Sequence, residues 1–257
     1  METDHTQSVN NFDTNYLSIK QTNNVTIIEE HLPFTVKIAY NDEELEKAIN
    51  IRQSAYARHV PELAELLKEP ETYDFDLGSI VLLAESKLDG SALGSIRIQT
   101  NRYEKLKLES SVNLPPWLQN KTLAEAGRLG VVGNKMGRIV KTMLFKAYYL
   151  YCLQESIDWM VITARAPVDR DYDALLFKDV FPERGYIPMA HDANIASRVM
   201  ALNVASVEPS WEHEHHPLFE LFFRKNHLDI DLHFKEESKS KYVANKLIPS
   251  TRGGIML

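Results

Sequence analysis

The order of hydrophobic and polar positions predicts a chain in which strands alternate with helices. Residues 34–40 alternate apolar and polar side chains, which is typical of a strand with one buried face. Residues 41–59 follow as a helix, because Asn41 or Asp42 can cap it and acidic residues fill its first turn. A second, shorter helix is predicted at residues 62–68. The opening part of the core is therefore a strand followed by two helices.

The middle of the chain contains four more strand patterns and one long amphipathic pattern. The first two strands are joined by the turn Asp89-Gly90, which predicts a hairpin. The last strand is apolar throughout, as expected in the interior of a mixed or parallel sheet. These elements are strands at 79–85, 93–99, 122–131 and 159–164 and a helix at 136–155. Together they predict an α/β fold around one central sheet.

Changes in residue composition and pattern divide the chain into four parts. Residues 1–35 are interpreted as an N-terminal arm. Its first 24 or so residues are rich in Asn, Thr and Gln and predict a flexible segment, and residues 25–28 suit a short strand or a clasp. Residues 36–167 form the predicted core. The remaining parts are a helical C-terminal extension at 168–234, with helix-like pieces at 175–180 and 218–225, and a flexible tail at 235–257.

Composition narrows the class of protein without naming an activity. The 257 residues are 44% hydrophobic and 25% charged, which is ordinary for a soluble globular protein. The single cysteine, Cys152, excludes an internal disulfide and is interpreted as a buried small residue. No stretch approaches the ~18 apolar residues of a membrane span, and the polar start does not resemble a signal peptide, so a cytoplasmic location is expected. A net charge of -7 argues against general nucleic-acid binding.

One predicted strand carries two charges, Glu125 and Arg128, among small and apolar residues. A buried ion pair is costly unless it is well partnered, so this pair favours a chemical role over a stabilising one. In a strand the two side chains point to opposite faces unless a bulge shifts the register, and Gly127 between them favours a bulge. Such a bulge leaves a backbone N–H near Gly130 or Val131 free to polarise a carbonyl. The alternative is that Glu125 only pairs with an arginine and holds the sheet together.

Other charged residues precede this strand in a characteristic order. They are Arg52-x-x-x-Tyr56, Glu69-x-Glu71-x-x-Asp74 and Gly94-x-x-Arg97, followed by Glu125-x-x-Arg128. In spacing and order the set resembles the acyl-homoserine-lactone synthases and the N-acyl amino acid synthases. Both are variants of the GCN5-related N-acetyltransferase fold that take long acyl chains from acyl carrier protein. The resemblance covers about residues 36–165 and implies a mixed central sheet flanked by helices.

The resemblance also assigns roles to these residues. It implies catalytic roles for Glu125 and Arg128. It implies substrate binding by Arg52, Glu69, Glu71, Asp74, Arg97 and Val131. A purely structural role in ion pairs is the alternative for the charged members of the set.

The loop before the long helix departs from the phosphate-binding motif of the acyl-CoA enzymes in that superfamily. Those enzymes show Gln/Arg-x-x-Gly-x-Gly/Ala, whereas a frame that ends on Gly137 has Val132 and Lys135 at its first and fourth positions. This departure fits the phosphopantetheine arm of acyl carrier protein, with a phosphate at the helix N-terminus. The residues assigned to carrier binding are Val132, Lys135, Gly137, Arg138 and Lys141. Together with Lys146, the basic residues form a candidate docking surface for an acidic carrier, with a solvated helix face as the alternative.

The resemblance implies direct aminolysis of a thioester, in which Glu125 takes a proton from the attacking amine. No tightly bound cofactor is expected, and the acylated phosphopantetheine of the carrier is the co-substrate. The acceptor is S-adenosylmethionine in one family and an amino acid in the other. The lactone synthases usually carry a Trp after the first motif, and residues 56–61 contain none. An amino acid is therefore predicted; a lactone synthase and a non-catalytic sensor of acylated carriers are the alternatives.

Two further charged clusters complete the candidate chemistry. The segment Trp211-Glu-His-Glu-His-His216 has the His-x-His spacing of a metal site. Such clusters in surface turns are more often unligated, so no metal is predicted. The segment Asp169-Arg-Asp-Tyr-Asp173 is interpreted as a helix start, with contact to the acceptor as the alternative.

Overall fold

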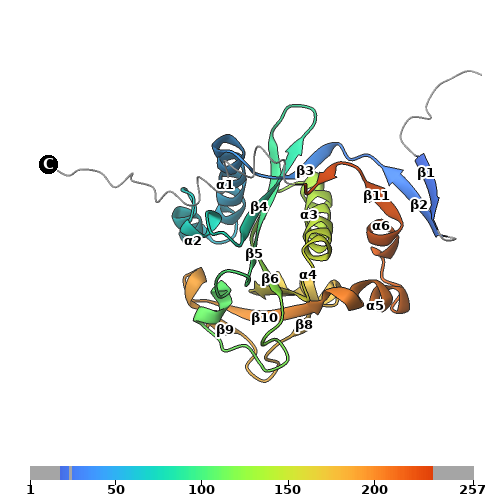
Figure 1. The fold of residues 1–257 in the computed structure, drawn as a ribbon. Helices are drawn as coiled ribbons and strands as arrows, with labels where there is room; N and C mark the ends of the chain where they lie inside the picture. The colour runs from blue at the N-terminus through green and yellow to red at the C-terminus, as the bar shows by residue number, and fades with distance from the viewer. Residues whose placement is uncertain (1–17, 23–24, 234–257) are drawn as a thin grey trace, which may run out of the picture.

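The computed structural model describes residues 18–22 and 25–233, and a nine-stranded mixed sheet runs through it (Figure 1). The strands along the sheet follow the order β12-β3-β4-β5-β6-β7-β10-β8, and β9 pairs with β10 beside this path. Their bounds are β3 (Phe34–Ile38), β4 (Ser79–Ser86), β5 (Ala92–Thr100), β6 (Leu123–Val131), β7 (Trp159–Ala164), β8 (Lys178–Asp179), β9 (Ile187–Met189), β10 (Ile195–Asn203) and β12 (Ile230–Asp231). Neighbours are antiparallel except for β6 with β7 and β3 with β12.

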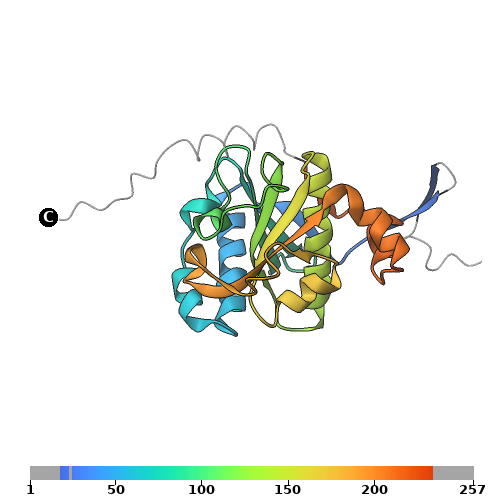
Figure 2. The ribbon, with the colours of Figure 1, turned by 90° about the horizontal axis from the view of Figure 1, so that it is seen from below.

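Helices cover both faces of this sheet. They are α1 (Asp42–Ala57), α2 (Pro61–Leu66) and α3 (Lys135–Gln154). The first and third stand on opposite sides of the strands (Figure 2). Alternate residues of β4 serve the two faces: Leu82 belongs to the core cluster of α3, whereas Leu83 clusters with Ala48 of α1. Burial on both faces explains the continuous apolar pattern of this strand. The strands and helices predicted between residues 34 and 164 are confirmed.

The sheet opens between β6 and β7. These parallel strands are in register only where residues 123–126 meet residues 159–162. Beyond Ala126, β6 continues along β5, while β7 continues along β10. Two strands that separate in this way leave their facing edges free to line a cavity. The sheet thus has an opening between β6 and β7.

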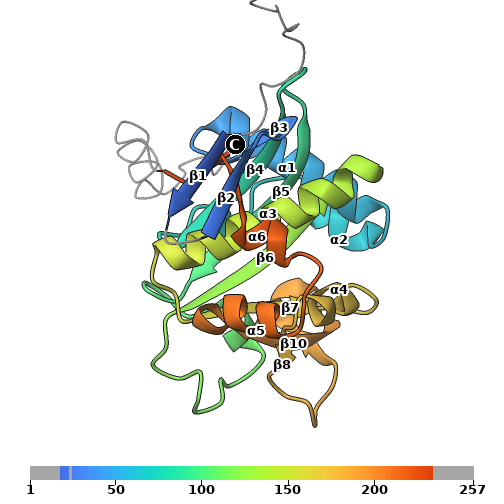
Figure 3. The ribbon, with the colours of Figure 1, turned by 90° about the vertical axis from the view of Figure 1, so that its right-hand side faces the viewer.

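The C-terminal part is not the purely helical extension that the sequence predicted. It contains α4 (Asp169–Ala174), α5 (Val207–His213) and α6 (Phe219–Phe223), but also strands from β8 to β12. β10 pairs with β7 along residues 198–203, and Figure 3 shows α4 and α5 beside these strands, away from α1. The helix predicted at 175–180 is wrong, because residues 178–179 form β8. The reason is the outer edge of β10, which pairs with β8, because the backbone groups of a sheet edge need partners that a strand supplies and a helix does not.

The N-terminal arm is tied to the same C-terminal part. Residues 25–28 lie in the strand β2 (Val25–Glu30), which pairs with β1 (Ser18–Thr22) and, in parallel, with β11 (Lys225–His227). This confirms the strand interpretation of residues 25–28. The flexible tail predicted at 235–257 lies outside the described residues. Within residues 18–22 and 25–233, no helix combines the length and apolar character needed to cross a membrane.

Candidate functional site

A bulge in β6 builds the site. Arg97 lies opposite Gly127 and Ser95 lies opposite Gly130, so β6 carries one residue more than β5 across this step. Arg128 adopts the left-handed conformation with a φ of 56°, a state that costs a non-glycine residue about 1 kcal/mol. The predicted bulge is confirmed, although the left-handed residue is Arg128 and not Gly127. The extra residue turns Arg128 toward the α1 side of the sheet.

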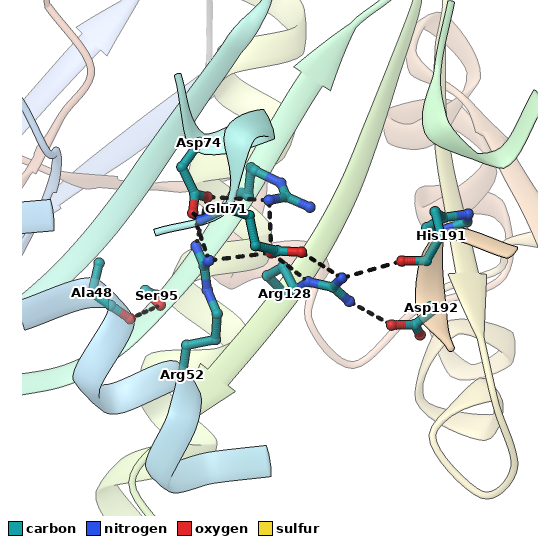
Figure 4. A network of polar contacts seen from close by, with 9 residues as sticks. Ala48, Arg52, Glu71, Asp74, Ser95, Arg128, His191 and Asp192 are labelled. Carbon is teal, nitrogen blue, oxygen red and sulfur yellow. Dashed lines mark hydrogen bonds and ion pairs between the residues drawn. The ribbon is translucent and has the colours of Figure 1, made fainter. Parts of the chain in front are cut away.

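Arg128 enters a network of buried ion pairs with the 3-10 helix η1 (Thr72–Asp74) and the residue before it (Figure 4). Its Nε and Nη2 donate to the two carboxylate oxygens of Glu71 at 2.7 and 2.8 Å. Arg52 makes a second two-pronged contact, with both Nη atoms 3.0 Å from the Asp74 oxygens. Arg97 Nη1 bridges the two acids, at 2.9 Å from Glu71 and 3.2 Å from Asp74. Four predicted substrate-binding residues thus contact one another around Arg128.

The network is electrically matched. Asp192, from the 3-10 helix η3 (Ala190–Asp192), accepts a hydrogen bond from Arg128 and provides a third carboxylate for three guanidinium groups. Burial opposes ionisation of Glu71, but Arg128 and Arg97 hold its pKa well below the usual range. The pKa of Asp74 is lowered by Arg52 against the same burial. These acids stay charged at neutral pH and are poor proton acceptors.

Two substrate-binding candidates lie outside the network. Glu69 is exposed, because η1 starts after it and turns Glu71 and Asp74 inward. Val131 pairs with Gly94 in the sheet, and its carbonyl accepts a hydrogen bond from Arg58. Its side chain lines the larger cavity described below. The structure therefore does not bring Glu69 to the other candidates, whereas it places Val131 at a cavity wall.

Glu125 occupies a separate position on β6, directly opposite Gln99 of β5. Its carboxylate accepts the N–H of Leu108 at 3.2 Å, and His191 Nε2 lies 3.7 Å away. Among the described residues no hydrogen bond or ion pair joins Glu125 to an arginine, so it is not the simple arginine partner that the sequence left open. Burial raises the pKa of Glu125 to about 7 and lowers the pKa of His191 to about 4. A neutral imidazole therefore faces an acid that titrates near neutrality.

Lys107, which sequence reasoning missed, completes this part of the site. It begins the 3-10 helix η2 (Lys107–Ser110), and the flanking Leu106 and Leu108 are anchored in a core cluster. Its Nζ lies 3.2 Å from the centroid of the Tyr73 ring. Burial and the nearby Arg97 lower the pKa of Lys107 to about 6. The one sequence signal for its burial was its position between two leucines in a loop. Two leucines packed in the core hold the residue between them close to the protein interior.

Two adjoining cavities lie in the opening of the sheet. The wide cavity, of about 250 Å³, lies beside the splayed strands, and its walls include Ala126, Leu129, Phe145, Ala164 and Tyr172. The polar cavity, of about 50 Å³, is lined among others by Arg97, Gln99, Lys107, Glu125 and His191. Both cavities are also lined by Tyr56, Gly127, Arg128, Thr163 and Asp192, so they adjoin at the bulge. His191 and Asp192 belong to the C-terminal part, which therefore closes the site.

The first turn of α3 lies beside the wide cavity. Asn134 caps the helix by accepting the N–H of Gly137 at 3.2 Å. A Cβ on residue 137 would lie 1.9 Å from the Val132 carbonyl oxygen, so this position requires glycine. Lys135 and Arg138 are exposed, whereas Lys141 pairs with Asp171 at 2.8 Å and lines the wide cavity. A basic face at the helix start is therefore present, and its binding of a carrier remains a prediction.

Lys146 is not part of that basic face. Its Nζ is buried and donates to the carbonyls of Leu221 and Lys225 at 2.8 and 2.6 Å, beside His227. Burial lowers the pKa of Lys146 to about 8. The inclusion of Lys146 in the docking surface was wrong, because helical spacing turns it toward α6 and β11.

The two remaining charged clusters contact neighbouring parts of the fold. The His216 ring stacks on Trp211 with centroids 3.8 Å apart, and its Nε2 lies 2.7 Å from the Ala174 carbonyl. Within the described part of the chain, no group of three His, Cys, Asp or Glu side chains is arranged to hold a metal ion. Asp169 starts α4 and pairs with Arg198 at 3.3 Å, which agrees with the helix-start interpretation.

The fold is shared with known acyltransferases. FeeM, an N-acyl amino acid synthase from uncultured soil microbes, superposes with a TM-score of 0.57 and 18% identity over 73% of this chain and 97% of that chain. BjaI, a CoA-dependent acyl-homoserine lactone synthase solved with SAM and isopentyl-CoA, gives 0.49 and 16% over 83% and 98%. A putative acetyltransferase of the GNAT family from Desulfovibrio desulfuricans gives 0.47 and 11% over 66% and 99%. No family model and no curated protein matches the chain. The chain has the GCN5-related N-acetyltransferase fold that the motif set implied.

Proposed function

We propose that this protein is an N-acyltransferase that moves a long acyl chain from acyl carrier protein to the α-amine of an amino acid. The observation that supports it most is the position of Glu125. This acid is buried, has a pKa of about 7, and faces a polar cavity that adjoins the wide cavity at the bulge. An acid with that pKa is suited to accept a proton at neutral pH.

This geometry supports the following reaction. The acceptor amine occupies the polar cavity and loses a proton to Glu125, directly or through a water. Its nitrogen attacks the thioester carbonyl carbon near Gly127, the C–S bond breaks, and the phosphopantetheine thiol leaves with a proton. The Val132 N–H already donates to the Leu93 carbonyl at 2.9 Å and is not available to the thioester. We therefore assign stabilisation of the oxyanion to a backbone N–H of the preceding bulge in β6.

The wide cavity suits the acyl chain. Apolar side chains such as Phe145 and Leu129 line it, next to the polar groups that reach the reacting centre. A third cavity of about 210 Å³ shares Lys141, Phe145 and Asp171 with it and continues toward Leu218 and Phe222. A chain that enters at the bulge therefore has an apolar path between α3 and α4.

The assignment of the donor to a carrier protein rests on α3. The loop before it lacks the glycine pattern that cradles a pyrophosphate, while Lys135 and Arg138 present positive charge to solvent at the helix start. Acidic carriers dock on such surfaces through long-range attraction. The choice of an amino acid as the acceptor is supported by the small volume of the polar cavity and by its closure by His191 and Asp192.

The test is an acceptor and donor screen. The protein is incubated with long-chain acyl carrier protein and either pooled amino acids or S-adenosylmethionine, and the lipid extract is analysed by mass spectrometry. We expect N-acyl amino acids, and we expect their loss with Glu125→Gln. If lactone forms from S-adenosylmethionine and no amino acid is acylated, the assignment of an amino acid as acceptor is wrong. If acyl-CoA supports equal rates, the assignment of acyl carrier protein as donor is wrong. If no acylated product forms, the proposed activity is wrong.

A further inference from the structure

The polar cavity contains side chains whose hydrogen-bonding capacity is unmet. Lys107 Nζ, Gln99 Oε1 and His191 Nδ1 are buried, and none has a hydrogen-bond partner among the described residues. Lys107 and Gln99 are 7% and 4% exposed, so bulk solvent does not satisfy them. Buried polar groups in folded proteins are almost always paired. All three residues line the same small cavity, so their unpaired polar atoms indicate a polar ligand there.

The distribution of charge indicates which end of a ligand goes where. Three basic side chains line the cavity, namely Arg97, Arg128 and Lys107. Burial and Arg97 lower the pKa of Lys107 to about 6, and a carboxylate bound beside its Nζ would raise that pKa and favour the charged form. The two arginines contact carboxylates of Glu71 or Asp192. Lys107 has no carboxylate within ion-pair distance in the part of the chain that the structure describes. It sits over the Tyr73 ring instead, so an anion is the partner that it lacks.

Two other residues of the cavity lining carry oxygens. Glu125 of β6 and Gln99 of β5 are directly paired across the sheet, so their side chains project on the same face. Their oxygens suit an ammonium group, and Glu125 is the base of the proposed reaction. The cavity therefore combines the oxygens of Glu125 and Gln99 on the sheet with the unpaired amine of Lys107 on η2. A free amino acid presents the two complementary charges one carbon apart.

We propose that Lys107 binds the carboxylate of the acceptor and so selects amino acids over amines that lack a free acid. The inference rests on the acyl transfer proposed above and adds the group by which the acceptor is recognised. The anchoring of Leu106 and Leu108 holds Lys107 in place before the acceptor arrives. The hydrogen bond from Ala190 to Ser111 at 2.8 Å ties the segment after η2 to η3, which carries His191.

The test compares each standard amino acid with its own carboxamide. With long-chain acyl carrier protein as donor, kcat and KM are measured for the wild-type protein and for Lys107→Met. We expect the wild-type KM to be about 10- to 100-fold lower for the acid than for the amide, the range for a hydrogen bond to a charged group. Lys107→Met should remove this preference by raising the KM of the acid alone, with kcat nearly unchanged. Lys107→Arg should retain part of it.

The matched control is Lys105→Met, which removes an exposed lysine two residues away and should change neither constant. A wild-type protein that acylates acids and amides equally well would overturn the carboxylate role and leave the acyltransferase standing. A Lys107→Met variant that loses kcat for both acceptors, with Lys107→Arg no better, would also overturn it. No acylation of any amine would instead refute the acyl transfer on which the inference rests.

Discussion

The arginine network and the polar cavity lie side by side and are electrostatic opposites. In the network, every guanidinium contacts a carboxylate, and the pKa values of Glu71 and Asp74 are held below their usual range. In the cavity, Lys107 has no acid partner, and the pKa values of Lys107 and Glu125 are about 6 and 7. The first region is fixed in one charge state at neutral pH. The second can gain or lose a proton there.

We infer from this difference that the matched charges mainly hold the fold and that the unmatched ones take part in chemistry. Arg97 and Arg128 belong to both regions, because they also line the polar cavity. Ion pairs that are matched and hydrogen-bonded hold η1 to α1, β5 and the bulge of β6, and so fix the shape of the opening. Groups that are buried without partners cost stability, and a fold retains them where a ligand or a reaction supplies the partner. We therefore expect variants of the network to affect folding and variants of the cavity to affect turnover.

The largest expected effect on stability is that of Asp74→Asn. It removes the nearest counter-charge of Arg52, whose side chain is completely buried and would keep only Glu71 at 3.5 Å, and breaking a buried ion pair costs about 3 to 5 kcal/mol. Chemical denaturation at neutral pH measures this loss. Because the folded pKa of Asp74 lies below its ordinary value of 3.8, the wild-type advantage should shrink as the pH falls below that value.

The control for Asp74 is Glu46→Gln, on the exposed side of α1. Its free energy of unfolding should stay within about 0.5 kcal/mol of the wild type. Equal stability of Asp74→Asn and Glu46→Gln would show that the network does not hold the fold.

A smaller effect is expected from two glycines that differ in their surroundings. Gly137→Ala places a Cβ 1.9 Å from the Val132 carbonyl oxygen and should cost about 1 to 3 kcal/mol. Gly127→Ala meets no atom within 4 Å, so its stability should be nearly unchanged. The new methyl group enters the junction of the two cavities, where it should lower turnover. Thermal unfolding and acyl-transfer rates on the same samples separate the two outcomes, and a destabilised Gly127→Ala would contradict the open junction.

The smallest expected effect is on carrier docking. The double variant Lys135→Glu and Arg138→Glu should raise the KM for acylated carrier about 10-fold at low salt, with less effect at high salt, because exposed charges are screened. Stopped-time product assays across a salt series measure it. Lys178→Glu, an exposed reversal on β8, is the matched control. An unchanged KM in the double variant would place the docking surface elsewhere.

The core of the fold could be predicted because its signals are local. The alternation at residues 34–40, the capped helix after it and the bulge near Gly127 all follow from neighbouring residues. The motif set also identified Arg52, Glu71, Asp74, Arg97 and Arg128, which the structure brings together. Motif membership alone did not show that Glu69 stays exposed.

The other half of the site could not be predicted, because it is assembled from distant segments. His191 and Asp192 reach β6 only because β10 extends the sheet beside β7, and the open edge that recruits β10 exists only in the folded protein. Lys107 is buried because two leucines anchor a short 3-10 helix after β5. Neither placement follows from the periodicity of one segment.

The most direct measurement of the division between structural and chemical charges is the pH dependence of kcat/KM for acyl transfer. Glu125 must lose its proton before it can accept another, so a raised pKa predicts a rate that rises with pH through about 7. A second rise at higher pH belongs to the amine of the acceptor. Glu125→Gln should lower kcat/KM by about 10²- to 10⁴-fold and abolish the step near 7, while the exposed Glu104→Gln retains it. A step near 7 that survives in Glu125→Gln would contradict the assignment of the chemistry to the polar cavity.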